Sequence, residues 1–182
     1  MLDSDEHYIK HLSESGMLSG PAQLLPIQQW FFDRVDQGTF AAYQHWNQSF
    51  VLDVPPLDIG ILNKSLALLF AYHDALRLVF TRDGNGGYSQ HYQSDVGEIP
   101  LSVIDDPVDA EQQIALFDRW QSEFDIFGGK LCHIGYITSE NAPRAKLHFA
   151  FHHLIMDAVS WHIIKQDLER ILSRAGSKCG EH

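Results

Sequence analysis

Basic side chains and long apolar runs are scarce in this sequence. Its 13 lysines and arginines stand against 24 aspartates and glutamates, a formal net charge of -11, and no basic cluster offsets it. A phosphate backbone needs such a cluster, so nucleic acid is excluded as a partner. No apolar run approaches the roughly 20 residues that span a bilayer, and the first residues are acidic where a signal peptide is basic. We therefore expect no membrane partner and a cytoplasmic location.

Cysteine is equally rare, whereas apolar residues are plentiful. Cys132 and Cys179 are too few for a disulfide framework or a zinc-type pair, so we expect reduced thiols and no bound metal. The 182 residues are 45% hydrophobic and 12% aromatic, which suffices for one compact domain. We expect a polar lead-in or linker at 1–23, a folded unit at 24–174 and a polar tail at 175–182.

Helices and strands alternate along the folded unit without a repeat. Apolar residues at helical spacing predict helices from Pro26 to about Gly38, from Ile61 to His73, from Asp106 to Phe124 and from Ser160 to about Ser173. Aromatic and β-branched stretches predict strands at 45–54, 76–80, 88–92, 101–104, 130–138 and 145–152, with a hairpin across 83–87. This order indicates an α/β or α+β sandwich with helices packed on a mixed sheet.

A histidine pair stands at the end of the last predicted strand. His152 and His153 are followed by Asp157 and by Ser160, where the last predicted helix begins. Histidine is frequent here, at 11 of 182 residues, so the pair alone proves little and the residues after it carry the signal. Neighbouring side chains of a strand point to opposite faces, so only one imidazole readily faces a given cleft. This favours a single general base over a shared metal site.

The arrangement resembles the His-His-x-x-x-Asp signature of the condensation superfamily of nonribosomal peptide synthetases. Its ending, Val159 to Trp161, looks more like the epimerization branch than the branch that forms amide bonds. Three further stretches, Leu25–Phe32, His45–Ser49 and His73–Arg77, resemble epimerization motifs in the expected order. The resemblance covers about 24–174. It implies one lobe, the N-terminal one, of a chloramphenicol-acetyltransferase-like α/β two-layer sandwich.

The resemblance also implies roles for the residues of the motif. His153 would be the catalytic base and His152 a supporting residue in the core. Asp157 would be structural and would pair with Arg77 on a neighbouring strand, in a bidentate contact that locks the loop. Ser160 supports the site as the N-cap of the last helix, because no glycine-flanked elbow marks it as a nucleophile.

One position departs from the family pattern. Ala158 follows the motif aspartate where the family usually has glycine. The added methyl group narrows the cleft or disfavours a positive φ, so we expect it to affect activity.

Substrate and partners follow from the same resemblance. An L-aminoacyl or peptidyl thioester, carried on the phosphopantetheine arm of a peptidyl carrier protein, would be converted to the D form, with no cofactor bound directly by the chain. His153 would serve one face of the α-carbon, and a glutamate from the C-terminal lobe of the same domain would serve the other. Other synthetase modules would be further partners. Because that second lobe is not in this sequence, we expect the 182 residues alone to be inactive.

Two alternatives remain open from the sequence. In a condensation lobe, His153 would orient or deprotonate the acceptor amine that attacks the donor thioester. In a docking lobe without catalysis, the chain would only recognise a carrier protein.

Overall fold

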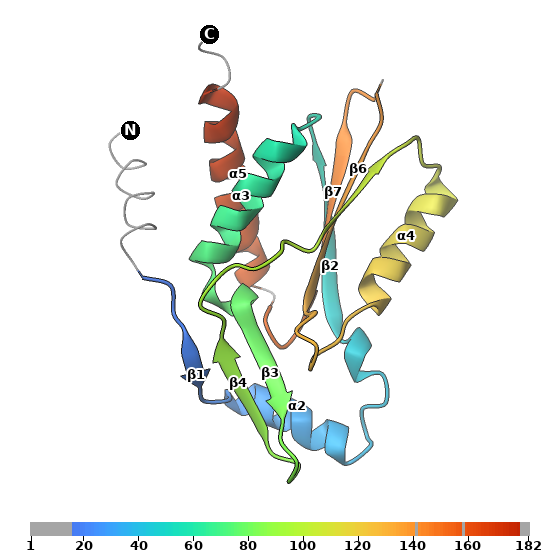
Figure 1. Ribbon diagram of the computed structural model, residues 1–182. Helices are drawn as coiled ribbons and strands as arrows, with labels where there is room; N and C mark the ends of the chain where they lie inside the picture. Colours follow the sequence, from blue (N-terminus) through green and yellow to red (C-terminus); the bar gives the residue numbers. More distant parts are fainter. Residues whose placement is uncertain (1–15, 141, 158, 179–182) are drawn as a thin grey trace.

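A four-stranded mixed sheet forms the centre of the chain. The computed structural model describes residues 16–140, 142–157 and 159–178. The sheet runs in the order β2-β7-β6-β5, with β5 and β6 parallel and the other neighbours antiparallel (Figure 1). Its strands are β2 (Asn47–Val54), β5 (Leu101–Asp105), β6 (Cys132–Thr138) and β7 (Ala145–His152).

Helices cover both faces of this sheet. On one face, α3 (Ile59–Tyr72) packs against α5 (Ser160–Lys178), and on the other lies α4 (Ala110–Ser122) (Figure 1). The predicted class, an α/β lobe with helices packed on a mixed sheet, is confirmed. Because both faces are covered, six of the seven residues of β6 are buried.

The two faces of β7 carry different chemistry, because successive side chains of a strand alternate between faces. Phe149 stacks on Phe50 of β2 with ring centroids 5.0 Å apart, and Trp161 of α5 covers Phe50 on the same face. His148 points to the opposite face, where it meets Trp120 of α4. One face of the sheet is therefore aromatic and aliphatic, and the other holds histidines under α4.

A second, three-stranded sheet lies beside the first. It has the order β1-β4-β3 and is antiparallel throughout, from strands β1 (Gly20–Ala22), β3 (Leu78–Arg82) and β4 (Tyr88–Tyr92). The predicted hairpin is confirmed, and Asp83 closes its turn by accepting the backbone N–H groups of Asn85 and Gly87. Helix α2 (Pro26–Asp36) packs on this sheet, with Phe32 stacked on Tyr88 at 4.2 Å.

The largest differences from the sequence prediction lie at three places, while other boundaries move by one or two residues. Gly20–Ala22, placed in the lead-in, pairs with β4 as an edge strand. Helix α4 begins at Ala110 rather than at Asp106, because Asp109 and Gln112 form a reciprocal capping box there. Helix α5 continues to Lys178, past the predicted end of the folded unit. A glycine lowers helix propensity without forbidding a helix, so Gly176 does not end this one.

Candidate functional site

The two motif histidines leave β7 at the point where the chain turns towards α5. His152 is the last residue of β7 and is fully buried. Its Nε2 donates to the carbonyl of Tyr43 at 2.8 Å, and its Nδ1 accepts the backbone N–H of Leu154 at 3.2 Å. Both ring nitrogens are thus used by the neutral ring, and burial lowers the pKa of His152 to about 4. This side chain holds the loop and does not face a cleft.

His153 lies on the other side of the strand and is half-buried. Its backbone N–H donates to the carbonyl of Trp46 at 2.9 Å, which continues the pairing of β7 with the start of β2. Its Nδ1 lies 3.3 Å from the side-chain Nε2 of Gln48. Burial lowers the pKa of His153, against a smaller opposing effect of the Met156 carbonyl. The imidazole is therefore neutral near pH 7 and able to accept a proton.

The ring of His153 rests on a stack of aromatic side chains. The Trp46 ring lies 4.7 Å from it, tilted by 32°. Trp46 in turn stacks on Phe31 at 5.1 Å and 10°, and Phe31 is fully buried in the core. The imidazole is thus supported through two rings by the packed interior, which restricts its orientation.

Asp157 has the predicted structural character but a different function. Its carboxylate accepts the backbone N–H groups of Val159 at 3.0 Å and Ser160 at 2.7 Å, where α5 begins. These hydrogen bonds lower the pKa of Asp157, and those with Ser160 have the largest effect. The capping predicted for Ser160 is therefore performed by Asp157, and Ser160 is the first residue of the helix. The prediction about Ala158 concerns a position outside the described residues.

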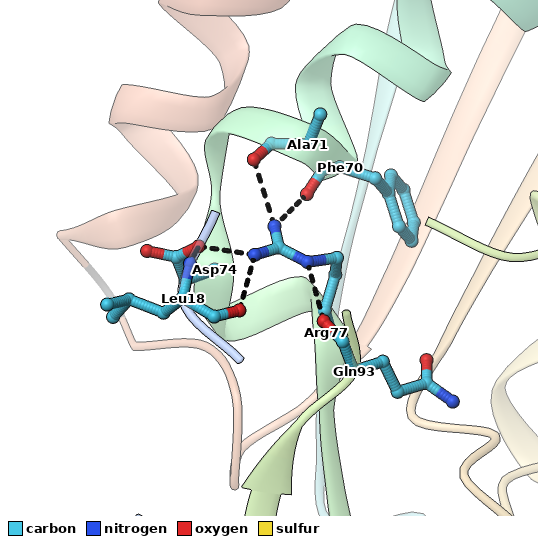
Figure 2. A network of polar contacts seen from close by, with 6 residues as sticks. All are labelled: Leu18, Phe70, Ala71, Asp74, Arg77 and Gln93. Atoms are coloured by element: carbon cyan, nitrogen blue, oxygen red, sulfur yellow. Dashed lines mark hydrogen bonds and ion pairs between the residues drawn. The ribbon is translucent and has the colours of Figure 1, made fainter. Parts of the chain in front are cut away.

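The predicted pair between Asp157 and Arg77 is wrong. Arg77 ends a short 3-10 helix (Asp74–Arg77) before β3 and does not lie on a strand as predicted. It is 1% exposed, and all five of its N–H donors have partners (Figure 2). Its guanidinium has no donor left for Asp157. The partners are the carbonyls of Leu18, Phe70, Ala71 and Gln93 and the carboxylate of Asp74.

This network has a consequence for the lead-in. Asp74 also accepts the backbone N–H of Leu18 at 3.1 Å, while Arg77 donates to the carbonyl of the same residue. The backbone N–H and the carbonyl of Leu18 are therefore both hydrogen-bonded to residues that follow α3 (Figure 2). Arg77 therefore holds together the end of α3, the entry to β3 and the lead-in.

A cavity of about 480 Å³ borders the motif loop on the side of α3 and α5. Met156 and Ser160 of the loop and His73 after α3 are among its lining residues. Nε2 of His73 lies 3.0 Å from the carboxylate of Asp167, whose side chain is 4% exposed. Burial lowers the pKa of His73, although Asp167 acts in the opposite direction. This pair links the end of α3 to α5 and was not predicted.

Trp46 and Gln48 have no role predicted from the sequence, although both lie in the stretch His45–Ser49 that resembles a family motif. Their contact with His153 depends on the register that pairs Asn47 with His152. Gln48 and His153 are 105 residues apart in the sequence. The register between their strands cannot be read from one sequence, so only the fold brings these residues together.

Metal-ligating clusters and membrane-spanning helices are not found in the described part of the chain. No group of three histidine, cysteine or acidic residues within 16–140, 142–157 and 159–178 is arranged to hold a metal ion. Over the same residues, no helix has the length and apolar character needed to cross a bilayer. Cys132 is a buried free thiol, and burial raises its pKa to about 12.

These features define an α/β lobe in which the half-buried His153 follows the last residue of the buried strand β7. The condensation domain family model matches residues 19–179, and the chain belongs to that family.

Individual relatives are large synthetases. The chain is 37% identical over 173 residues to the N-(5-amino-5-carboxypentanoyl)-L-cysteinyl-D-valine synthase of Amycolatopsis lactamdurans, a match that covers 93% of the chain and 4% of the relative. It is 32% identical over 182 residues to gramicidin S synthase 1 of Brevibacillus brevis, covering 96% of the chain and 16% of the relative. The chain thus spans a small fraction of these proteins.

A solved structure is similar over most of the chain. The epimerization domain from the third module of tyrocidine synthetase B superposes with a TM-score of 0.76 at 29% identity, covering 91% of this chain and 37% of that one. The starter condensation domain of rhizomide synthetase has a TM-score of 0.73 at 17% identity and covers 88% of this chain and 39% of that one, which shows the shared fold.

Proposed function

We propose that the chain acts as the N-terminal lobe of an epimerization domain, which converts an L-aminoacyl or peptidyl thioester on a carrier protein to the D form. The observation that carries this proposal is the imidazole of His153, neutral, half-buried and held against β2 at the end of β7. Similarity to an epimerization domain structure and to a synthase whose name contains D-valine supports the epimerization branch.

The chemistry requires one proton to leave and one to return. His153 removes the α-proton, and the electron pair of the C–H bond moves into the thioester carbonyl to form an enolate. A second acid, proposed as a glutamate of the C-terminal lobe, returns a proton to the opposite face as the carbonyl re-forms. The phosphopantetheine arm carries the substrate and is not consumed. A neutral His153 suits the first step, because a protonated imidazole has no lone pair to offer.

The proposed reaction makes the second half of the domain a required partner. The matched epimerization domain structure is covered to 37% by this chain, and the second acid/base group is proposed to lie in the remainder. The 182 residues alone are therefore expected to show no turnover. Racemisation of an aminoacyl carrier protein by this chain alone, lost in His153→Ala, would contradict the proposal that a second lobe is needed.

The test uses the parent domain with a carrier protein loaded with an L-aminoacyl phosphopantetheine, in D₂O. His153→Ala is expected to lower D-product formation and deuterium uptake at the α-carbon by roughly 100- to 10,000-fold, the usual contribution of a general base. His162→Ala, on the exposed face of α5, is the matched control and should retain activity. Full activity of His153→Ala would rule out this residue as the base.

A condensation lobe is the second candidate, favoured by the family model that matches the chain. There His153 would act on the acceptor amine instead of the α-proton. Supplying donor and acceptor carrier proteins to the same parent domain separates the two: peptide bond formation without D-product identifies condensation. A domain that binds carrier protein and performs neither reaction, with an undisturbed His153 signal, would indicate docking alone.

A further inference from the structure

In the contact between Gln48 and His153, the two side chains have different hydrogen-bonding roles. The atom of Gln48 that lies 3.3 Å from Nδ1 is the amide nitrogen Nε2. An amide N–H can only donate, so Nδ1 accepts in this arrangement, and a neutral ring then carries its proton on Nε2. The side chain of Gln48 therefore bears directly on which ring nitrogen of His153 has the lone pair.

Gln48 is held in place by the sheet. Asn47 pairs with His152 and Gln48 with Phe151 in the antiparallel register of β2 and β7. The backbone N–H of His153 donates to the carbonyl of Trp46, so the main chains on both sides of the contact are fixed. Movement at the contact is left to the side chains, and a half turn of the Gln48 amide exchanges its Nε2 for its Oε1.

Trp46 and Gln48 constrain the imidazole in complementary ways. The indole supports the face of the ring at 4.7 Å, which leaves rotation within the ring plane open. The amide of Gln48 binds the edge of the ring and restricts that rotation. The carbonyl of Met156 is a further polar group at the ring, where it acts to raise the pKa of His153 against the larger effect of burial. The neighbouring titratable groups are already engaged, His152 by Tyr43 and Asp157 by the amides at the start of α5.

We propose that Gln48 is a positioning residue that sets the tautomer of His153. With its amide nitrogen towards the ring, the resting imidazole holds its proton on Nε2. With Oε1 towards the ring, Gln48 accepts from Nδ1–H, and the lone pair moves to Nε2, the form in which that nitrogen removes a proton. The importance of this choice rests on the proposed function of His153 as the base, whereas the tautomer itself is measurable without turnover.

The experiment is long-range ¹H–¹⁵N NMR of the imidazoles in the ¹⁵N-labelled chain near neutral pH, with His153 assigned by the signals lost in His153→Ala. The native chain is expected to show the Nε2–H tautomer. Gln48→Glu places a carboxylate acceptor at Nδ1, so the Nδ1–H tautomer should dominate, a change of about tenfold or more in the tautomer ratio given the strength of hydrogen bonds to charged groups. Gln166→Glu, which adds the same charge on the exposed face of α5, should leave the ratio unchanged.

A second variant guards against misfolding of the first. Gln48→Leu keeps the approximate volume and removes both polar atoms, so the ratio should move away from the native value, with the Met156 carbonyl as the polar group left at the ring. The proposal is overturned if a folded Gln48→Glu or Gln48→Leu chain retains the native tautomer ratio, since a purely structural contact would not move it. A ratio that follows Gln48, in a parent domain without epimerase activity, supports this inference and contradicts the proposed function alone.

Discussion

Neighbouring residues of one chemical type receive different functions from their hydrogen bonds. Both ring nitrogens of His152 bond main-chain groups, whereas the ring of His153 contacts the Gln48 amide and the Trp46 indole and is also affected by the Met156 carbonyl. Burial lowers the pKa of both rings, but His152 is fully buried, whereas His153 is half-buried and so partly exposed. The distinction between a supporting histidine and a base therefore lies in which partners surround each ring.

A prediction at this scale concerns Asp157. Asp157→Ala removes the acceptor for two backbone N–H groups at the start of α5, so the free energy of unfolding should fall by about 1 kcal/mol, as for other caps. Asp157→Asn keeps an oxygen acceptor and should be close to the native chain. Urea denaturation measures both. An asparagine variant as unstable as the alanine variant would instead point to an ion pair that needs the charge.

At the scale of elements, one glycine allows α4 to approach the sheet. A Cβ built on Gly135 of β6 would lie 2.0 Å from the ring of Trp120. The indole occupies the place of the missing side chain and stacks on His133 at 5.1 Å. Glycine is used here for close packing of a helix on a strand, not for an unusual backbone angle.

Gly135→Ala should therefore destabilise the fold. Overpacking of this kind costs about 1–3 kcal/mol, because the large, 3%-exposed Trp120 cannot withdraw into solvent. The matched control is Gly84→Ala, where no atom lies within 4 Å of the added methyl group. Combining Gly135→Ala with Trp120→Leu should recover part of the loss in a double-mutant cycle. Additive effects of the two changes would show that the ring and the strand do not compete for this space.

At the scale of the whole molecule, the sheet face under α4 buries three histidines as neutral rings. Burial is the largest cause that lowers the pKa of His133, His148 and His152, each to about 4 from the usual value of 6.5. Neither ring nitrogen of His148 has a hydrogen-bond partner among the described residues, and its ring stacks on Phe117 at 4.3 Å. The lobe thus depends on these rings staying uncharged.

Stability should consequently fall in acid. Between pH 6.5 and about 4 the unfolded chain binds protons at these positions and the folded chain does not, so the free energy of unfolding decreases as the pH drops through this window. Urea midpoints measured from pH 7 downwards test this. His148→Leu should make the dependence of stability on pH shallower. It should not lower stability at pH 7, because the His148 ring makes no hydrogen bond that the change would break. The exposed His45→Leu is the control; an unchanged slope in His148→Leu would contradict the prediction.

The sequence by itself determined the type and order of most elements, the hairpin and the special position of the histidine pair. These follow from local signals: apolar periodicity, turn residues and a motif within ten consecutive positions. Local signals also misplaced the start of α4, because the sequence offers two possible N-caps, Asp106 and Asp109. Only Asp109 has a glutamine three residues later, Gln112, with which it forms a capping box.

Tertiary structure alone decided which side chains meet. The family resemblance implied a pair between Arg77 and Asp157. Instead, the guanidinium bonds nearby carbonyls and Asp74, and the carboxylate of Asp157 bonds the amides at the start of α5. Gln48 contacts His153 because of the register in which β2 pairs with β7. The physical reason is that hydrogen-bonding groups pair with whatever the fold brings within about 3 Å, and that distance is set by packing between elements far apart in the chain.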